Sequence, residues 1–268
     1  MKQTILVDGK LKEIYVRLMD ESFIVYRKMY RPPLTPDNID KINPGDWAEH
    51  LERFKREGWQ QIIEEFFQKQ IQVIGSCGVL AWDGGGVIGK MYFTTKELYN
   101  RFRKEGYYCV EHESMPRIIQ SISNEELTRL LKSSSKTLRI ICFNVGHSDT
   151  RYQGKGIAST MIELLKEWAG KRGWSRLEAL AYPDVIPYGA WAPHILRRGA
   201  LERRGFHVLE ERQITEEERK HQRSYLDRYL NEVGRIHHSW GFEEAEKRVY
   251  DSSAMNNYHK EYLMTFNL

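Results

Sequence analysis

The sequence predicts an α/β fold, in which a sheet is flanked by helices and carries helical insertions. Three observations lead to this prediction. A dense apolar run, "TLRIICFNV" at 137–145, is typical of a strand buried at the centre of a sheet. From Gly156 a long helical pattern places its apolar residues on one stripe and stops at Gly173. Strand patterns and a short helical pattern then alternate toward the C-terminus.

The N-terminal elements follow from local composition. The segment 13–22 mixes β-branched and aromatic residues and is predicted to form the first strand. Apolar residues at helical spacing from about 46 to 70 predict a long helix, broken in two at Gly58. The stretch 71–95 is expected to form two strands joined by a hairpin at 83–86, where glycines supply positive φ angles.

Two insertions and the C-terminal elements complete the prediction. Residues 96–136 are expected to be partly helical, and Ser123 with Glu126 fits a capping box. The remaining predicted elements are a strand at 175–182, a short basic helix at 195–206, a strand at 207–214, a helical insert at about 215–258 and a last strand at 261–268. Because the chain has no repeat or linker, residues 1–268 are expected to form one domain with insertions at about 96–136 and 215–258.

Composition and charge exclude several classes of protein. A hydrophobic fraction of 41% and a charged fraction of 29% describe an ordinary globular chain. The three cysteines, at 77, 109 and 142, are widely spaced, which favours a reducing compartment and argues against disulfides or a metal site. A net charge of +4 gives no reason to expect a nucleic-acid partner, and no apolar run is long enough to span a membrane. We therefore expect a cytoplasmic protein.

The stretch "RYQGKGIAS" at 151–159 is a glycine-rich turn that opens the long helix. Backbone N–H groups and the helix dipole make such a turn suitable for an anion. It does not fit the triphosphate P-loop, because Asp149 stands where the first glycine is required and Gly156 follows Lys155. A dinucleotide turn fits weakly, because Ser159 occupies the third glycine position and eight residues separate Val145 from the first glycine.

The third match is specific. "QGKGIA", from Gln153 to Ala158, fits the pattern R/Q-x-x-G-x-G/A and resembles the pyrophosphate turn of the GNAT acyltransferase superfamily. A buried strand before the turn, an amphipathic helix after it and a later short helix ending in Gly205-Phe206 are similar to that superfamily as well. The resemblance implies a mixed, mostly antiparallel sheet with a splayed parallel pair of central strands. The loop at 145–153 is longer than the family usually has.

The resemblance also implies an N-acyltransferase that moves an acetyl group from acetyl-coenzyme A to an amine by direct attack in a ternary complex, without a metal. The strand end at Asn144 and Val145 would pair with the pantetheine arm like an added strand. The turn residues implied in coenzyme A binding are Gln153, Gly154, Lys155, Gly156, Ile157, Ala158 and Ser159. The acceptor is expected to be a small-molecule or peptide amine, and the oligomeric state is left open, a homodimer included.

Catalytic residues are less well specified. Leu201 stands where many family members have a tyrosine that protonates the departing thiolate. Tyr182 and Tyr188 are therefore the candidate acids, and His194 or Glu178 the candidate base. Each also has a structural interpretation, as a packing residue, a helix cap or a buried ion-pair partner. The missing tyrosine keeps a second class open, a coenzyme A-binding sensor or structural domain without turnover, and a dinucleotide-binding oxidoreductase comes third.

The helical insert is predicted to border the acceptor side of the site. Its apolar residues Leu226, Leu230 and Val233 fall on one helical face. We expect at least two helices there, packed on the same sheet.

Overall fold

The computed structural model describes residues 1–20, 58–84, 87–105, 114–145, 150–183, 196–215 and 260–268. These residues fall into two compact units, residues 1–177 with Leu268 and residues 178–267. The predicted organisation as one domain stays a prediction. Among the described residues, no helix is long and apolar enough to cross a membrane.

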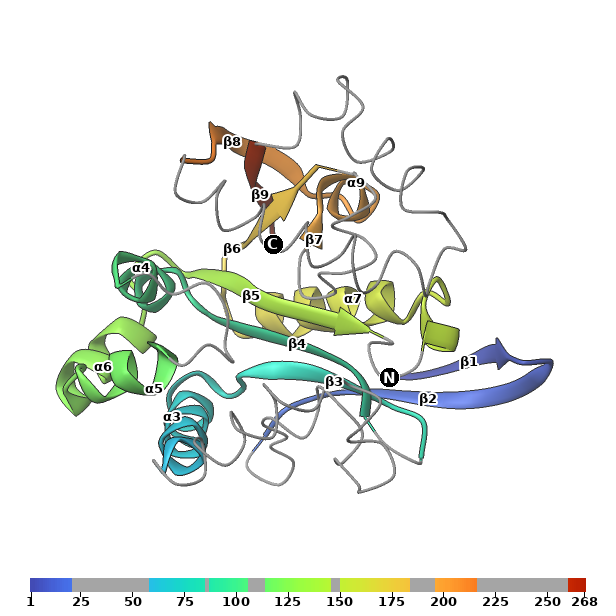
Figure 1. Cartoon of the computed structure of the whole chain (residues 1–268), viewed down its shortest axis with the longest axis horizontal. Coiled ribbons are helices and arrows are strands. Elements are labelled where there is room, and N and C mark those ends of the chain that lie inside the picture. Colours follow the sequence, from blue (N-terminus) through green and yellow to red (C-terminus); the bar gives the residue numbers. More distant parts are fainter. Residues whose placement is uncertain (21–57, 85–86, 106–113, 146–149, 184–195, 216–259) are drawn as a thin grey trace, which may run out of the picture. The chain divides into compact units, whose positions relative to one another are not determined.

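The first unit contains an antiparallel sheet (Figure 1). Its strands are β1 (Lys2–Val7), β2 (Lys10–Leu18), β3 (Gly78–Trp82), β4 (Val87–Thr95) and β5 (Thr137–Val145). They follow one another in the order β1-β2-β3-β4-β5, and each neighbouring pair is antiparallel. The predicted strand at 137–145 is confirmed with the same bounds, and so is the antiparallel pairing of the two strands on either side of 83–86.

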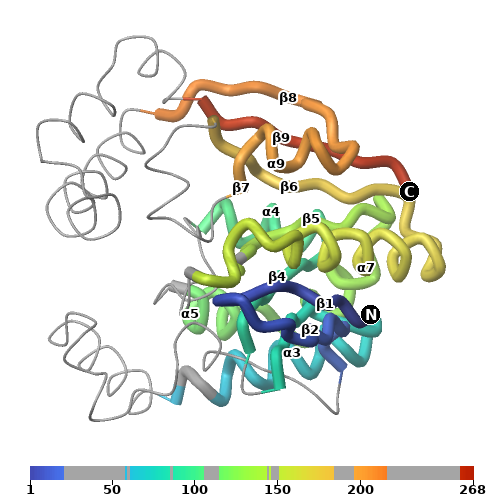
Figure 2. The backbone as a smooth tube through the Cα atoms, turned by 90° about the vertical axis from the view of Figure 1, so that its right-hand side faces the viewer, coloured from blue at the N-terminus to red at the C-terminus, as the bar shows by residue number. Residues whose placement is uncertain are grey.

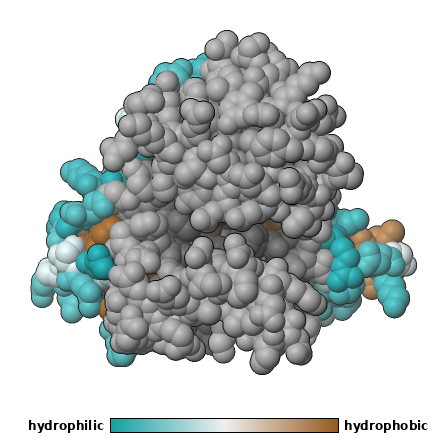
Figure 3. Space-filling view, in the orientation of Figure 1, coloured by the Kyte–Doolittle hydropathy of each residue, from teal (hydrophilic) through white to brown (hydrophobic). Residues whose placement is uncertain are grey.

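The N-terminal strands form a hairpin that the prediction of a first strand at 13–22 missed. The chain turns at Asp8 and Gly9, which have positive φ angles of 48° and 73°. An Asp-Gly pair favours a two-residue turn of this kind, because both central residues must adopt positive φ. The first strand is therefore β1, and β2 already ends at Leu18. Leu6 and Leu11, cross-strand partners beside the turn, are exposed and contribute to the apolar surface over this hairpin (Figure 3).

Two helices cover opposite faces of this sheet. Phe67 of α3 (Trp59–Ile74) stacks on Tyr92 with ring centroids 5.0 Å apart. Trp168 of α7 (Ile157–Lys171) packs against Phe93 with centroids 5.2 Å apart. Because successive residues of a strand point to opposite faces, α3 and α7 lie on different sides of β4.

The helix α3 corrects the predicted boundary at residue 70. It continues to Ile74 and ends at Gly75, whose φ is 93° and whose N–H donates to the Ile71 carbonyl at 2.7 Å. Ile71 and Ile74 are buried and follow Phe67 at intervals of four and three residues. The apolar run that was expected to start a strand thus completes a helical stripe. Gly58 directly precedes α3, and the helix predicted before it lies outside the described residues.

The first insertion is partly helical, as predicted. It contains α4 (Lys96–Lys104), α5 (Ser114–Gln120) and α6 (Asn124–Leu131). The Ser123 hydroxyl accepts a hydrogen bond from the Glu126 N–H at 3.1 Å, which is half of the predicted capping box. Thr95 caps α4 in the same way by accepting from the Leu98 N–H.

A carboxylate of α4 gives the insertion a pH-dependent contribution to stability. Burial by itself would raise the pKa of Glu97, but hydrogen bonds from the Ser133 hydroxyl at 2.6 Å and the Ser135 N–H at 3.0 Å outweigh it and lower the pKa. The contribution is therefore present above about pH 4 and is lost as the pH falls through the lowered pKa. Urea unfolding between about pH 3 and 7 should show Glu97→Gln less stable at pH 7 and less sensitive to acid. A Glu125→Gln variant with the same acid sensitivity as Glu97→Gln would contradict this account.

The second unit contains β6 (Arg176–Tyr182) from Glu178 onward, β7 (Leu196–Arg197), α9 (Arg198–Glu202), β8 (His207–Gln213) and β9 (Lys260–Asn267). The strand order is β6-β9-β8, with β8 and β9 antiparallel. The predicted strands are confirmed here, whereas the helix predicted at 195–206 is only five residues long. It starts late because β7 pairs in parallel with the end of β6. Gly205 has a φ of 82°, and Phe206 packs on Phe266 with centroids 5.5 Å apart.

Two predictions are not tested by these elements. The splayed parallel pair of central strands stays a prediction. The insert at about 215–258 lies, apart from Thr215, outside the described residues.

Candidate functional site

The glycine turn lies where the sequence places it, between a buried strand and a long helix. β5 ends at Val145, a short 3-10 helix covers Thr150–Tyr152, and α7 begins at Ile157. Gly154 and Gly156 have φ angles of 70° and 79°. Residues with a side chain rarely adopt this left-handed conformation, so both positions favour glycine.

The helix end presents backbone donors. Gly156 is the N-cap of α7, no side chain caps the helix, and no acidic residue stands in its first turn. The Gly156 carbonyl accepts from the N–H groups of Ser159 at 2.9 Å and Thr160 at 3.2 Å. The N–H groups of Ile157 and Ala158 have no acceptor within the helix by its geometry. Together with the dipole of 15 aligned residues, they make this end attractive to an anion.

The side chains of the turn differ in their exposure to solvent. Gln153 and Lys155 are exposed, and Ile157 is buried, so it can offer a ligand only its backbone. Ala158 is small and half-buried beside it, as is Ser159. The predicted turn residues are thus contiguous, and Gln153 and Lys155 are the side chains among them that face solvent.

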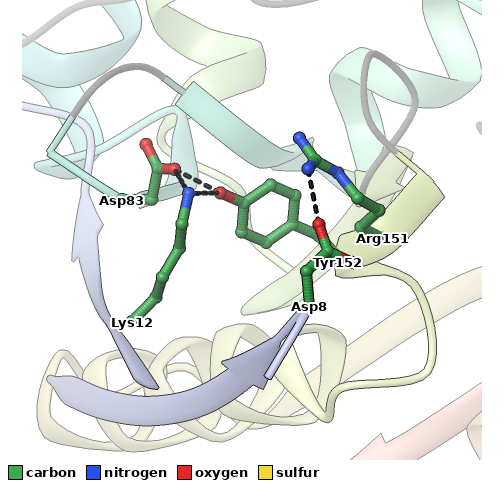
Figure 4. Close-up of polar contacts among 5 residues, drawn as sticks. All are labelled: Asp8, Lys12, Asp83, Arg151 and Tyr152. Atoms are coloured by element: carbon green, nitrogen blue, oxygen red, sulfur yellow. Dashed lines mark hydrogen bonds and ion pairs between the residues drawn. The ribbon is translucent and has the colours of Figure 1, made fainter. Parts of the chain in front are cut away.

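A polar cluster that was not predicted ties the start of the turn to the N-terminal hairpin (Figure 4). Tyr152 is buried, accepts a hydrogen bond from Lys12 Nζ at 2.7 Å and donates one to Asp83. Lys12 and Asp83 also form an ion pair at 3.2 Å. One residue earlier, Arg151 pairs with Asp8 at 2.6 Å. Strands β1 and β2 thus run beside the beginning of α7, as Figure 2 shows.

Removal of the Tyr152 hydroxyl should weaken the attachment of the turn to Lys12 and Asp83. Burial, followed by the hydrogen bond to Asp83, raises the pKa of Tyr152, so the phenol keeps its proton at neutral pH. Tyr152→Phe leaves the Lys12–Asp83 ion pair without its shared partner, and we expect a loss of about 1 kcal/mol in urea unfolding. Tyr15→Phe is the control, because the Tyr15 hydroxyl donates to Glu13 in an exposed position. Equal losses in the two variants would count against an anchoring role.

The strand before the turn carries a bulge. Tyr92 of β4 is opposite Cys142, but Phe93 is opposite Ile140, so Ile141 is an extra residue on β5. Asn144 and Val145 pair with Lys90 and Gly89 of β4. Pairing with a pantetheine arm would use the other edge of β5, and this role of Asn144 and Val145 stays a prediction.

Two of the predicted catalytic residues lie in the second unit. Glu178 and Tyr182 share one face of β6, because they are four residues apart on a strand, and Glu178 is fully buried. The Tyr182 hydroxyl donates to Glu261 at 2.9 Å, and Arg212 Nε donates to the same carboxylate at 2.7 Å. Glu261 is buried on β9, and neither it nor Arg212 was predicted.

The remaining candidates are placed as follows. Tyr188 and His194 lie outside the described residues. Leu201, at the position where the family often has tyrosine, is fully buried in α9 and has no proton to donate. Among the described residues, no three His, Cys, Asp or Glu side chains are grouped to hold a metal ion.

No protein-family model and no curated protein sequence matches the chain. Among solved structures, it is similar to an IAA acetyltransferase from Bacillus cereus ATCC 14579, with 13% identity, 95% of this chain and 99% of that chain covered, and a TM-score of 0.39. It is also similar to an acetyltransferase of Bacillus subtilis in complex with CoA, with 12% identity, 95% of this chain and 99% of that chain covered, and a TM-score of 0.38. The third is a GNAT family acetyltransferase from Elizabethkingia anophelis with acetyl-CoA bound, with 9% identity, 95% of this chain and 98% of that chain covered, and a TM-score of 0.37. All three are acetyltransferases. At these values the similarity decides neither reaction nor substrate.

The order of elements in the structure agrees with the resemblance that the sequence shows. The strand, glycine turn, long helix, strand, short helix with Gly205-Phe206 and strand follow one another as predicted. The sheet pairs are antiparallel apart from β6–β7 among those that the described residues define. The predicted fold class, a mixed α/β fold with a mostly antiparallel sheet and flanking helices, is confirmed.

Proposed function

We propose that the chain belongs to the GNAT superfamily and transfers an acetyl group from acetyl-coenzyme A to an amine. The observation that carries this proposal is the turn at 153–159. It combines two glycines in left-handed conformation, a lysine and a helix N-terminus without a side-chain cap or an acidic residue. These properties suit the binding of a pyrophosphate.

The turn would bind the cofactor mainly through its backbone. The N–H groups of Gly154, Gly156, Ile157 and Ala158 would face the pyrophosphate, while Gln153, Lys155 and Ser159 line the turn. Small residues are needed there because the phosphates approach the main chain closely. The ends of β5 at Asn144 and Val145 would pair with the pantetheine arm.

The reaction asks little of the protein. The amine nitrogen attacks the thioester carbon, the carbon–sulfur bond breaks, the nitrogen loses a proton and the thiolate gains one. A backbone N–H of β5 would polarise the carbonyl oxygen. Tyr182 or Tyr188 would supply the proton to sulfur, and Glu178 or His194 would accept the proton from nitrogen.

A second function is favoured by two observations. The position of the family's tyrosine is filled by the buried Leu201, and the hydroxyl of Tyr182 is engaged with Glu261. A domain that binds coenzyme A as a sensor or structural module, without turnover, needs no proton donor. A dinucleotide-binding oxidoreductase is the third candidate. A small-molecule or peptide amine as the acceptor and a location in the cytoplasm stay predictions. The oligomeric state stays open.

Two experiments separate these functions. Calorimetric titration with coenzyme A and with NAD should show binding of coenzyme A alone, and binding of NAD alone would overturn the proposal. Release of free thiol from acetyl-coenzyme A, assayed with a panel of small-molecule and peptide amines, should then rise with at least one amine. Coenzyme A binding without thiol release for any amine in the panel would favour the sensor or structural domain.

A further inference from the structure

Gln3 of β1 makes two hydrogen bonds across the glycine turn. Its Nε2 donates to the Lys155 carbonyl at 3.0 Å, and its Oε1 accepts from the Thr160 hydroxyl at 2.8 Å. Lys155 precedes Gly156, and Thr160 lies in the first turn of α7. One carboxamide thus bridges the two sides of the helix start, although Gln3 and Lys155 are 152 positions apart in the chain.

The contact with Lys155 fixes a donor of the proposed site. The Lys155 carbonyl and the Gly156 N–H belong to the same peptide group, and in a trans peptide they point in opposite directions. Because Gln3 holds the carbonyl on its own side, the Gly156 N–H is directed away from β1. Gly156 has a φ of 79°, and a Cβ placed on it would lie 3.4 Å from Gln3 Nε2. Glycine leaves this peptide free to rotate, so an external contact is needed to hold one orientation.

We infer that Gln3 is a positioning residue, which orients the 155–156 peptide so that the Gly156 N–H points at the pyrophosphate of coenzyme A. This inference rests on the proposed function. The Arg151–Asp8 ion pair and the cluster of Tyr152 with Lys12 attach the preceding residues of the turn to the same hairpin. The β1–β2 hairpin therefore acts as the support of the cofactor turn, and Gln3 supplies the contact nearest to the phosphates.

Four variants test this role in the full chain. Gln3→Ala removes both hydrogen bonds, and Gln3→Met removes them while it keeps the length of the side chain. Thr160→Val removes the bond to Oε1, together with a 3.5 Å contact from the Thr160 hydroxyl to the Gly156 carbonyl, and keeps the bond from Gln3 to Lys155. Thr4→Ala is the matched control, because Thr4 is the exposed neighbour on the same strand. The measurements are the Kd for coenzyme A by calorimetry and the urea midpoint of the unliganded protein.

Both Gln3 variants are expected to raise the Kd about tenfold over that of Thr4→Ala, by more than their fall in the urea midpoint accounts for. Thr160→Val should have a smaller effect, because the bond to the Lys155 carbonyl remains. In the thiol-release assay, the Gln3 variants should raise the KM for acetyl-coenzyme A and leave kcat unchanged at saturation.

The outcomes that overturn the inference are distinct from failure of the proposed function. If wild type and Thr4→Ala both fail to bind coenzyme A, the proposed function is wrong, and the positioning role is wrong with it. If wild type binds and Gln3→Met binds equally well, the carboxamide does not position the turn. A fall in the urea midpoint that accounts for the whole loss of binding would likewise show that Gln3 acts on stability alone.

Discussion

Gly156→Glu is expected to abolish the binding of coenzyme A. The substitution places a carboxylate and its stem at the N-cap of α7, where the proposed pyrophosphate lies. Repulsion between like charges, loss of the close approach to the backbone and the strain of a side chain at a φ of 79° all act in the same direction. The strain itself costs about 1–2 kcal/mol, so the fold is expected to survive.

The matched control is Gly173→Glu, at the other end of α7. Gly173 also has positive φ, 73°, and a Cβ there would meet no atom within 4 Å. Gly173→Glu therefore introduces the same charge and the same kind of backbone strain, but at a distance from the turn. Calorimetry should show normal affinity for Gly173→Glu and none for Gly156→Glu. Normal binding by Gly156→Glu would show that the turn is not the phosphate site.

Tyr182→Phe is expected to lower kcat by about 10²–10⁴-fold and to leave the affinity for coenzyme A nearly unchanged. An ordinary phenol, with a pKa of about 10, keeps its proton at neutral pH and can therefore donate it to a departing thiolate. The hydroxyl donates to Glu261, so as the proposed acid it would turn from this carboxylate to the sulfur. Steady-state kinetics with the amine found in the thiol-release panel measures the effect.

Tyr262→Phe serves as the control for a phenol in the same unit. Tyr262 is buried next to Glu261 on β9, and its ring lies 4.8 Å from the Arg198 guanidinium carbon. It should retain kcat. If Tyr182→Phe and Tyr188→Phe both turn over like wild type, the thiolate leaves unassisted or through water. The bond from Tyr182 to Glu261 would then be a structural link only.

Elements with a strong local pattern could be predicted from the sequence. The strand at 137–145 is a continuous apolar run, and its bounds agree with those of β5. The hairpin of β1 and β2 was missed although Asp8-Gly9 is a turn signal, because β1 has only six residues and the first three, Lys2 to Thr4, are polar. At 71–74, β-branched residues suggested a strand, but packing of Ile71 and Ile74 beside Phe67 extended the helix α3.

In the candidate site, too, local features could be predicted from the sequence, whereas contacts between distant segments could not. The turn at 153–159 was predictable because its glycines and lysine are consecutive. Its supports were not, because each joins segments that only the sheet brings together: Tyr152 meets Asp83 across 69 positions, and Gln3 meets Lys155 across 152. The same holds for Tyr182 and Glu261, which are 79 positions apart. No local pattern encodes these contacts.

The most direct test of the central claim, that the glycine turn holds the pyrophosphate, is a titration of 15N-labelled protein with coenzyme A, followed by NMR. The account predicts that the amide signals of Gly154, Gly156, Ile157 and Ala158 shift together and saturate, while that of Gly173 at the far end of α7 stays in place. Saturable binding of coenzyme A that leaves all four turn amides unshifted would contradict it.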